Sequence, residues 1–357
     1  MIMASLRVVN RLVCRGFIVL TLLLMFFNEV LIYYIARSNW QKIECKLDNC
    51  TRLLLIADPQ ILGTSYDRSY HGPLARYDSD KFLQKSFEHA VSFTQPHIIV
   101  FLGDLLDEGN IATAQEYQLY VKRFKRIFQN KKFTNRVHVP GDNDIGGENG
   151  DYISNSNLRR FENEFMSEDL FDYDNHLRFF KINRMLLDFT NPDRDHNAER
   201  LRIGVSHAPL LIGGGPLLRA IISDLDPHII FTGHWHESRI FIYPSTKVIN
   251  FYENTVRHFD LKGLKEQDHS YLEIMVPTCS YRMGKSKIGM GYAVLENYDL
   301  SYTVLWLPNR FVLLFVYVFW GLFVLCGAIV YKMMTRCPFR VAKRQTVYSR
   351  VSTIPQF

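Results

Sequence analysis

The sequence Ile98-Ile99-Val100-Phe101-Leu102-Gly103-Asp104 is an apolar, β-branched run that ends in glycine and aspartate. A short run of this kind predicts a buried strand that leads directly into a loop. Because the loop begins with Asp104, the strand would present a carboxylate at its carboxyl end. The same arrangement recurs along the chain, and the prediction of both fold and site starts from it.

Four other segments have the same form, a short apolar run followed by residues that can bind a metal ion. The runs cover residues 53–56, 137–139, 203–205 and 229–231. The residues that follow them are Asp58-Pro59-Gln60, Gly141-Asp142-Asn143-Asp144, Ser206-His207 and Gly233-His234-Trp235-His236. Five such strand ends predict one site at a common sheet edge. Three histidines combined with aspartates favour Mn, Fe or Zn over Ca and Mg, which prefer all-oxygen ligand shells.

Two apolar segments lie outside this pattern. Residues 311–331 contain no charged side chain and are long enough to cross a bilayer as a helix. Residues 16–36 are a second candidate span, interrupted by Asn28 and Glu29. A cleaved signal peptide is the alternative, but the lack of a convincing cleavage site favours an uncleaved signal anchor. Glu29 would lie toward the end of that span, where hydration or partial protonation lowers its cost.

Basic residues flank both spans on the sides that face the chain termini. They are Arg7, Arg11, Arg15, Lys332, Arg336, Arg340, Lys343 and Arg344. The positive-inside rule then predicts a cytosolic amino terminus (1–15), a luminal domain (37–310) between the spans and a cytosolic basic tail (332–357). Basic tails that bind anionic head groups would give the same topology. Because these flanks explain most of the net charge of +6, no nucleic-acid partner is indicated.

The segment after the first span carries two signs of a luminal environment. Asn49-Cys50-Thr51 is a glycosylation sequon. A bridge between Cys45 and Cys50 is plausible in an oxidising lumen. Cys279 is as readily a free, buried thiol.

The segments between the spans predict one large α/β domain. Helical periodicity appears at residues 80–95, 113–129 and 155–165, and the first of these helices would start after Ser79-Asp80. Beyond residue 236 the pattern changes to strands, at residues 239–243, 248–251, 271–276, 292–296 and 302–306. A βα first half followed by a run of strands predicts two packed sheets flanked by helices.

The ordered motifs D-x-(H/Q), G-D, G-(N/D)-x-D, S-H and G-H-x-H resemble those of the calcineurin-like metallophosphoesterase superfamily over residues 52–307. With two flanking spans and the segments at residues 58–63 and 103–109, the chain is similar to the membrane-anchored family that removes ethanolamine phosphate from GPI-anchor glycans. The resemblance implies an α/β fold of two mixed sheets packed as a sandwich, with two divalent metal ions, Mn or else Zn or Fe. It also implies a phosphodiesterase that acts at the membrane lipid bilayer on GPI-anchored proteins, in the endoplasmic reticulum, its exit sites, the intermediate compartment and the Golgi.

The resemblance also implies a role for each matching residue. The first metal would be held by Asp58, Gln60 and His236, and the second by Asp142, His207 and His234. Asp104 would bridge the two, because two neighbouring cations repel unless an anionic ligand lies between them.

Three positions depart from the superfamily pattern. Gln60 replaces a histidine and would ligate more weakly, whereas Asp142 replaces an asparagine and adds a negative charge. Asn143 occupies the catalytic position of a histidine that contacts phosphate and assists the leaving group. Asparagine can donate a hydrogen bond there but cannot deliver a proton. Asp144, the usual partner of that histidine, would then be a structural carboxylate.

Two alternatives stay open beside the GPI phosphodiesterase, the first of them because of Asn143. One is a catalytically weak protein of the same fold that binds the glycan as a cargo adaptor. The other is a phosphatase for other luminal phosphoesters. Because every proposed ligand position carries a residue with a suitable donor atom, an enzyme is favoured.

Overall fold

The computed structural model describes residues 2–47, 49–66, 68–129, 135–147, 152–165, 170–174, 176–189, 200–245, 247–268 and 270–336. The chain forms two compact units. The larger unit is Leu20–Phe311, and the smaller unit combines Met1–Val19 with Val312–Phe357.

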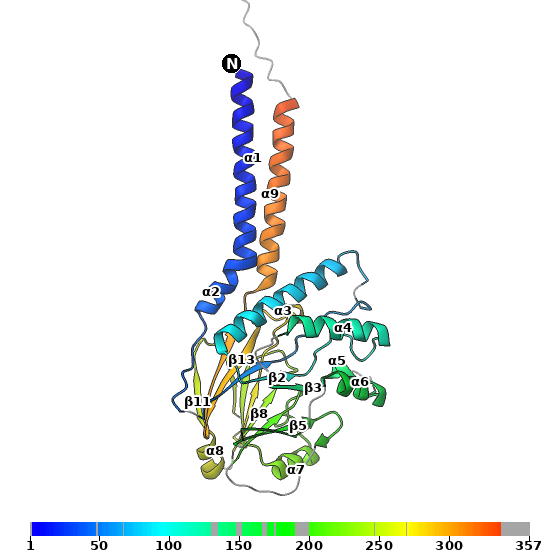
Figure 1. The fold of residues 1–357 in the computed structure, drawn as a ribbon, viewed down its shortest axis with the longest axis vertical. Coiled ribbons are helices and arrows are strands. Elements are labelled where there is room, and N and C mark those ends of the chain that lie inside the picture. The colour runs from blue at the N-terminus through cyan, green and yellow to red at the C-terminus, as the bar shows by residue number, and fades with distance from the viewer. Residues whose placement is uncertain are drawn as a thin grey trace, which may run out of the picture. The chain divides into compact units, whose positions relative to one another are not determined.

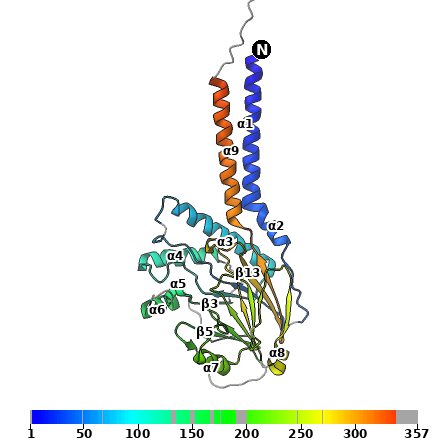
Figure 2. The same ribbon diagram turned by 180° about the vertical axis from the view of Figure 1, so that it is seen from behind.

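The larger unit contains two β-sheets (Figures 1 and 2). The first sheet has the strand order β11-β14-β13-β1-β2-β3. Its strands are β1 (Thr51–Ile56), β2 (Ile98–Leu102), β3 (Asn135–Val139), β11 (Arg257–Asp260), β13 (Gly289–Glu296) and β14 (Asp299–Trp306). Strands β1, β2 and β3 run parallel, whereas β13 pairs antiparallel with β1 and β14, so the sheet is mixed.

The second sheet has the order β10-β9-β12-β8-β7-β5-β4, and β6 pairs with β5. Its strands are β4 (Leu170–Tyr173), β5 (Leu177–Asn183), β6 (Asp188–Phe189), β7 (Leu201–Val205), β8 (Ile229–Thr232), β9 (Arg239–Tyr243), β10 (Lys247–Asn250) and β12 (Tyr271–Met275). Strands β5, β7, β8 and β12 are parallel. Parallel strands of one sheet end at the same edge, so their following loops lie together.

Alternating side chains of each strand serve two different cores. In β1, Leu53 and Leu55 belong to the core between the sheets, which also contains Val205 and Phe231. Leu54 of the same strand belongs to a second core, formed with the helices on the outer face of the first sheet. This alternation follows from the two-residue repeat of a strand and explains why the central strands are apolar throughout.

Helices flank the two sheets. They are α3 (Gly72–Thr94), α4 (Ala114–Ile127), α5 (Asp142–Ile145), α6 (Asn155–Phe165), α7 (Pro216–Leu225) and α8 (Leu261–Asp268). Buried side chains of α3, α4 and α6 pack on the first sheet, and those of α7 pack on the second. The predicted α/β sandwich of two mixed sheets flanked by helices is confirmed.

The helix expected at residues 80–95 begins earlier than predicted, at Gly72. Ser79 and Asp80 are buried within it and do not cap it. Asp80 instead accepts hydrogen bonds from Arg123 on α4, at 2.9 and 2.7 Å. Proline in the first turn marks the true start, because its fixed φ suits that position. Ser79-Asp80 therefore resembles a helix cap in sequence, but Asp80 forms a buried ion pair with Arg123.

The remaining helices are α1 (Ile2–Phe26), the π-helical segment η1 (Phe27–Leu31), α2 (Ile32–Ser38) and α9 (Arg310–Arg336). Two stretches of them, Leu12–Ser38 and Arg310–Met333, are long and apolar enough to cross a membrane. Within the smaller unit, the Phe17 ring packs against Trp320 and Phe323. The expected basic tail lies beyond the described residues from position 337 onward.

Glu29 is ion-paired. Its carboxylate lies 2.8 Å from Nη2 of Arg310 and 3.0 Å from Nζ of Lys85 on α3. Arg310 is buried and also pairs with Asp78 of α3. The sequence suggested that hydration or partial protonation lowers the cost of the Glu29 charge. In the structure, the two cations Arg310 and Lys85 compensate it.

The segment after α2 contains the predicted disulfide between Cys45 and Cys50. The side-chain nitrogen of Asn49, within the sequon, donates to Oδ1 of Asn297 at 2.5 Å. Cys279 is a free, buried thiol.

Candidate metal centre

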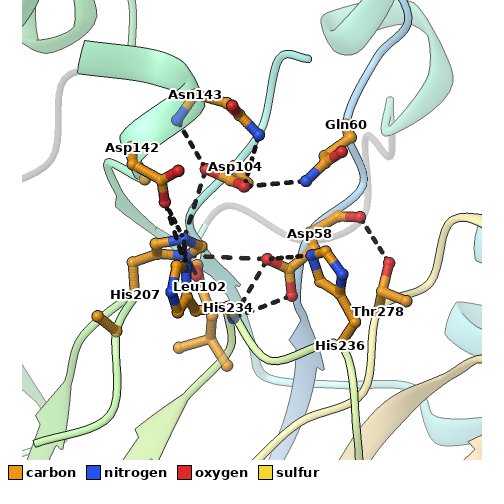
Figure 3. A network of polar contacts seen from close by, with 12 residues as sticks. Asp58, Gln60, Leu102, Asp104, Asp142, Asn143, His207, His234, His236 and Thr278 are labelled. Carbon is orange, nitrogen blue, oxygen red and sulfur yellow. Dashed lines mark hydrogen bonds and ion pairs between the residues drawn. The ribbon is translucent and has the colours of Figure 1, made fainter. Parts of the chain in front are cut away.

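The predicted site residues come together where five strands end (Figure 3). Asp58 and Gln60 follow β1, and Asp104 follows β2. Asp142 and Asn143 begin α5 just after β3. The three histidines follow strands of the second sheet, His207 after β7 and both His234 and His236 after β8. The five strand ends form one site, but they belong to two sheets and not to the single common sheet edge that the strand pattern predicted.

The backbone is left-handed at five of the seven predicted ligands. The φ angles are 49° at Asp58, 42° at Gln60, 50° at Asp104, 69° at His234 and 60° at His236. Residues other than glycine rarely adopt this conformation, which costs on the order of 1–2 kcal/mol per residue. Such strain clusters at functional sites, where the surrounding fold enforces it. It turns each side chain sharply out of the strand direction and toward the others.

His207 has one ring nitrogen fixed by the backbone. Its Nδ1 lies 2.8 Å from the carbonyl oxygen of Leu102, which can only accept, so Nδ1 carries the proton. The other nitrogen, Nε2, lies 2.9 Å from Oδ1 of Asp142 and 3.4 Å from Oδ1 of Asp104. When a metal ion displaces the proton from Nε2, an imidazole oriented in this way presents that nitrogen to the ion.

The other two histidines approach different carboxylates. Nδ1 of His234 lies 3.3 Å from Oδ1 of Asp142 and 3.1 Å from Nε2 of His207. Nε2 of His236 lies 3.6 Å from Oδ1 of Asp58. The backbone N–H of His234 also donates to both carboxylate oxygens of Asp58, at 3.2 Å. The two histidines thus divide between the two ends of the site.

Asp104 lies between these ends and receives several hydrogen bonds. Gln60 Nε2 and Asn143 Nδ2 both donate to its Oδ2, each at 2.9 Å, and the Asn143 backbone donates to Oδ1 at 3.0 Å. Gln60 therefore turns its amide nitrogen toward Asp104. Its carbonyl oxygen, the atom able to bind a metal, would reach the same place only after the amide rotates by half a turn.

Two glycines allow this close packing. A Cβ atom at Gly141 would lie 2.1 Å from Oδ1 of Asp104. A Cβ atom at Gly103 would lie 2.4 Å from Nδ1 of His207, and φ at Gly103 is +88°. Both distances are far below van der Waals contact, so only glycine fits beside these side chains.

Burial shapes the charges of the acidic residues. Desolvation, together with the charge of Asp104, raises the pKa of Asp58 to about 8, and burial also raises the pKa of Asp104. Burial alone would raise the pKa of Asp142 as well, but hydrogen bonds from His207 and His234 hold it well below its usual range. Carboxylates crowded in a buried site favour a bound cation, which compensates their charge.

The histidines respond in opposite directions. Burial would lower the pKa of His207, yet the carboxylates of Asp104, Asp142 and Asp58 raise it well above its ordinary value. Burial and the positive charges of nearby His207 and His234 lower the pKa of His236 to about 4. His236 is therefore neutral at physiological pH, which is the form that binds a metal.

Two overlapping groups of donor atoms have the spacing of metal ligands. Asp58, Asp104 and His207 form one group, and Asp142, His207 and His234 form the other, with the donor atoms of each within 4.8 Å of one another. Mixed nitrogen and oxygen donors fit divalent transition metals. The described residues thus include a buried Asp/His site that fits divalent metal ions, with His207 common to both groups.

Asp144 has a structural position. It accepts backbone hydrogen bonds from Leu105, Leu106 and Gly141, at 2.9 to 3.0 Å. Burial and the charge of Asp104 raise its pKa to about 7. Asp144 therefore ties the loop after β3 to the loop after β2, and its oxygens are engaged by the backbone.

Two supporting residues were not predicted from the sequence. Thr278 donates its hydroxyl to the backbone carbonyl of Asp58 at 2.8 Å. It follows β12, which lies parallel to β8, so the rule of strand ends applied once more would have found it. The buried Glu273 on β12 accepts from the backbone of Leu210 and Leu211, at 2.8 and 2.9 Å, and holds the loop that follows His207. No local pattern marks Glu273.

Residues 51–238 match the family model of the calcineurin-like phosphoesterases, and the chain belongs to this family. The family and the buried Asp/His site together define a metal-dependent phosphoesterase.

Relatives named metallophosphoesterase 1 are similar to this chain. The protein of Danio rerio is 31% identical over 142 residues, which cover 39% of this chain and 36% of that protein. The metallophosphoesterase 1 homolog of Caenorhabditis elegans is 24% identical and covers 93% of this chain and 94% of its own length. The chain spans less than half of the length of the vertebrate relatives it matches first. A solved metallophosphoesterase of Sphaerobacter thermophilus is 13% identical, with a TM-score of 0.37 over 72% of this chain and 88% of that one.

Proposed function

We propose that the protein is a membrane-anchored phosphodiesterase that uses two divalent metal ions. The proposal rests on the two overlapping groups of donor atoms. His207 belongs to both groups, and Asp104 lies 3.4 Å from its Nε2. Three buried carboxylates, those of Asp58, Asp104 and Asp142, lie close to the single ring of His207. A site for one metal ion would need fewer carboxylates than this. A second cation is the simplest way to compensate that charge.

The proposed ligands follow the two ends of the site. Asp58, Gln60 and His236 would hold one ion, and Asp142, His207 and His234 the other, with Asp104 shared. When bound, the two ions act as Lewis acids toward phosphoryl oxygens and make water a stronger nucleophile at neutral pH. Mn is the favoured metal, with Zn or Fe as alternatives, because the donors are mixed nitrogen and oxygen.

The protein groups supply orientation and hydrogen bonds. Leu102 fixes the ring of His207, and the Asn143 backbone and side chain hold the carboxylate of Asp104. Asn143 donates one amide hydrogen to Asp104 and has a second amide hydrogen to offer to a phosphoryl oxygen. It cannot protonate a leaving group, so hydrolysis of esters with poor leaving groups should be slow.

The proposed substrate is an ethanolamine-phosphate branch on the glycan of GPI-anchored proteins. The motif resemblance and the name of the similar vertebrate proteins support the enzyme class. Two helices with the length and composition of membrane spans favour a substrate held at the membrane lipid bilayer. On this proposal the catalytic domain is luminal, in the endoplasmic reticulum, its exit sites, the intermediate compartment and the Golgi.

The second candidate function is a glycan-binding cargo adaptor. Asn143 favours it, because an amide in this position donates hydrogen bonds but delivers no proton to a leaving group. An adaptor would bind the same glycan and release little ethanolamine phosphate.

One assay separates these functions. Purified full-length protein is given a GPI glycan or an aryl phosphodiester, with and without a chelator, and released phosphoester is measured. The proposed enzyme releases ethanolamine phosphate only with metal, and Asp104→Asn abolishes the release. Asp107→Asn, which changes a nearby carboxyl outside the ligand set, is the matched control and keeps the activity. Glycan binding without release would establish the adaptor, and release from the aryl substrate alone would establish another phosphoesterase.

A further inference from the structure

Helix α3 exposes a row of large side chains to solvent. Tyr66 and Tyr70 lie in the segment before the helix, and Leu74 and Tyr77 lie in its first turns. Tyr70 is fully exposed, and Leu74 is 69% exposed. We call these four residues the tyrosine stripe. A row of exposed aromatic and aliphatic side chains is uncommon on a soluble surface and marks an interaction site.

The helical repeat places Leu74, Tyr77 and Lys81 on one face. Nζ of Lys81 lies 6.0 Å from the centre of the Tyr77 ring. The opposite face of α3 is buried, with Leu83 and Phe87 in the core. Exposed Arg68 and His71 add basic character beside the stripe.

This combination fits the layer between lipid tails and water. Tyrosine rings prefer the level of the lipid head groups. Lysine and arginine keep their apolar stems near the lipid tails and extend their charged ends toward the phosphate groups. Tyrosine and arginine are also enriched at protein–protein interfaces, so the chemistry of the stripe fits a lipid surface and the position of α3 decides for it.

The position of α3 supports the same partner. Asp78 pairs with Arg310, the first residue of the second candidate span, and Lys85 pairs with Glu29 near the end of the first. The ring of Tyr33, also in the first span, lies 6.0 Å from that of Phe82. All these contacts lie within the larger unit. The stripe and these contacts occupy adjacent faces of one helix, so α3 lies where both candidate spans join the domain.

The stripe is confined to the amino-terminal half of α3. Farther along the exposed face, the residues are polar: Glu88 and Ser92. Ser92 accepts a hydrogen bond from Arg37 at 3.3 Å. The change from aromatic to polar residues along one exposed face is expected of a helix of which only one half reaches the lipid.

We propose that the tyrosine stripe lies in the head-group layer of the bilayer that the two helices cross. This inference rests on the proposed membrane attachment and extends it, because it gives the larger unit a lipid-binding surface of its own. The loop after Gln60 leads to the stripe, and the backbone N–H groups of Ser65 and Tyr66 both donate to Glu108 at 2.7 Å. The candidate metal centre would then be held close to substrates embedded in the membrane.

Spin labels on full-length protein in phosphatidylcholine–phosphatidylserine vesicles test the proposal. Cys14, Cys326 and Cys337 are first replaced by serine, and single cysteines are introduced by Leu74→Cys or Tyr77→Cys. Relaxation by oxygen, which concentrates in lipid, is compared with relaxation by a nickel chelate, which stays in water. Labels at both positions should be relaxed more by oxygen than by the chelate.

Leu217→Cys is the matched control, because Leu217 is another helical leucine, 57% exposed. It lies on α7, at the other end of the larger unit from α3 (Figures 1 and 2). The label there should favour the nickel chelate. If labels at Leu74 and Tyr77 behave like the label at Leu217, the proposal is wrong. Spin–spin broadening at Leu74 with poor access for both reagents would also overturn it, because a second copy of the chain would then cover the stripe.

A label introduced by Phe319→Cys separates this proposal from the membrane attachment on which it rests. Phe319 is an exposed residue of α9 within the second candidate span. If that label favours oxygen and the stripe labels favour the chelate, only the lipid-binding surface is rejected. If the Phe319 label also favours the chelate, the span itself is rejected.

Discussion

Asn143 donates hydrogen bonds to both carboxylate oxygens of Asp104, through its backbone N–H at 3.0 Å and its side-chain amide at 2.9 Å. Asp104 is also bound by the amide of Gln60. The carboxylate proposed to be shared by two metal ions thus accepts three hydrogen bonds from these two residues. The first two predictions follow from this pair of residues.

Replacing Asp104 by Asn should lower the occupancy of both proposed metal positions, because a neutral amide provides one ligand oxygen and no negative charge. His236→Ala should mainly empty one position, because His236 approaches only the Asp58 end. Elemental analysis of purified protein measures both effects, and Asp107→Asn serves as the control. Unchanged metal content in Asp104→Asn would show that this carboxylate is not shared.

Replacing Asn143 by His should raise turnover on a phosphodiester with a poor leaving group, by up to about 10²-fold, because imidazole can donate a proton. An activated aryl phosphodiester needs no proton and should show a much smaller gain. Steady-state rates on the two substrates, with metal content as the control, provide the comparison. Equal gains on both would mean that the change acts through the contact with Asp104 and supplies no proton.

Stability should fall as pH drops below about 6.5 because of His228. Burial, with the positive charges of Lys265 and Arg202, lowers the pKa of His228 to about 3 in the folded state. Its Nδ1 accepts the backbone N–H of Arg202 at 3.0 Å, which only the neutral ring can do. The unfolded chain, with an ordinary pKa near 6.5, then binds more protons, so acid favours unfolding. At about pH 5, the free energy of unfolding should be lower by about 2 kcal/mol, because each pH unit below 6.5 costs about 1.36 kcal/mol.

Urea unfolding of the full-length protein at several pH values measures this dependence. His228→Gln should reduce it below about pH 6.5, while other buried histidines such as His138, whose pKa burial lowers to about 3, still contribute. His258→Gln is the control, because His258 lies exposed on β11. An identical pH dependence in wild type and His228→Gln would show that other groups control acid stability.

The basic flanks predict that both termini face the cytosol. Protease added to intact microsomes should therefore remove epitope tags from either end and spare the central domain. Detergent should expose the domain and serves as the control for sealed vesicles. A protected carboxyl-terminal tag would contradict a crossing by residues 311–331.

The strand ends were predictable because two signals coincide there. A buried parallel strand is an uninterrupted apolar run, and the ligand follows it directly, as at Phe101-Leu102-Gly103-Asp104. Helix α6 was equally accessible, since its apolar stripe and its polar start agree. These features depend on neighbours in the sequence alone.

Other features depend on contacts that no local pattern records. The early start of α3 was missed because Ser79 and Asp80 resemble a cap, while Arg123 on another helix makes Asp80 a buried partner. Strand β5 was missed although Leu177, Phe179 and Ile182 are buried in it, because charged residues interrupt the run. The orientation of the Gln60 amide is set by Asp104, a residue that only the folded chain brings near.

The left-handed backbone at Asp58, Gln60, Asp104, His234 and His236 has a consequence for how this centre can change. The two sheets impose these turns, so the directions of the side chains survive when a side chain is replaced by another of similar reach. The residue type at each of these five positions can then vary while the positions of the ligand atoms stay nearly the same. A glutamine such as Gln60, or an aspartate such as Asp142, in place of a more usual ligand would change the charge and the metal affinity of the site. The backbone that positions the ligands would stay the same.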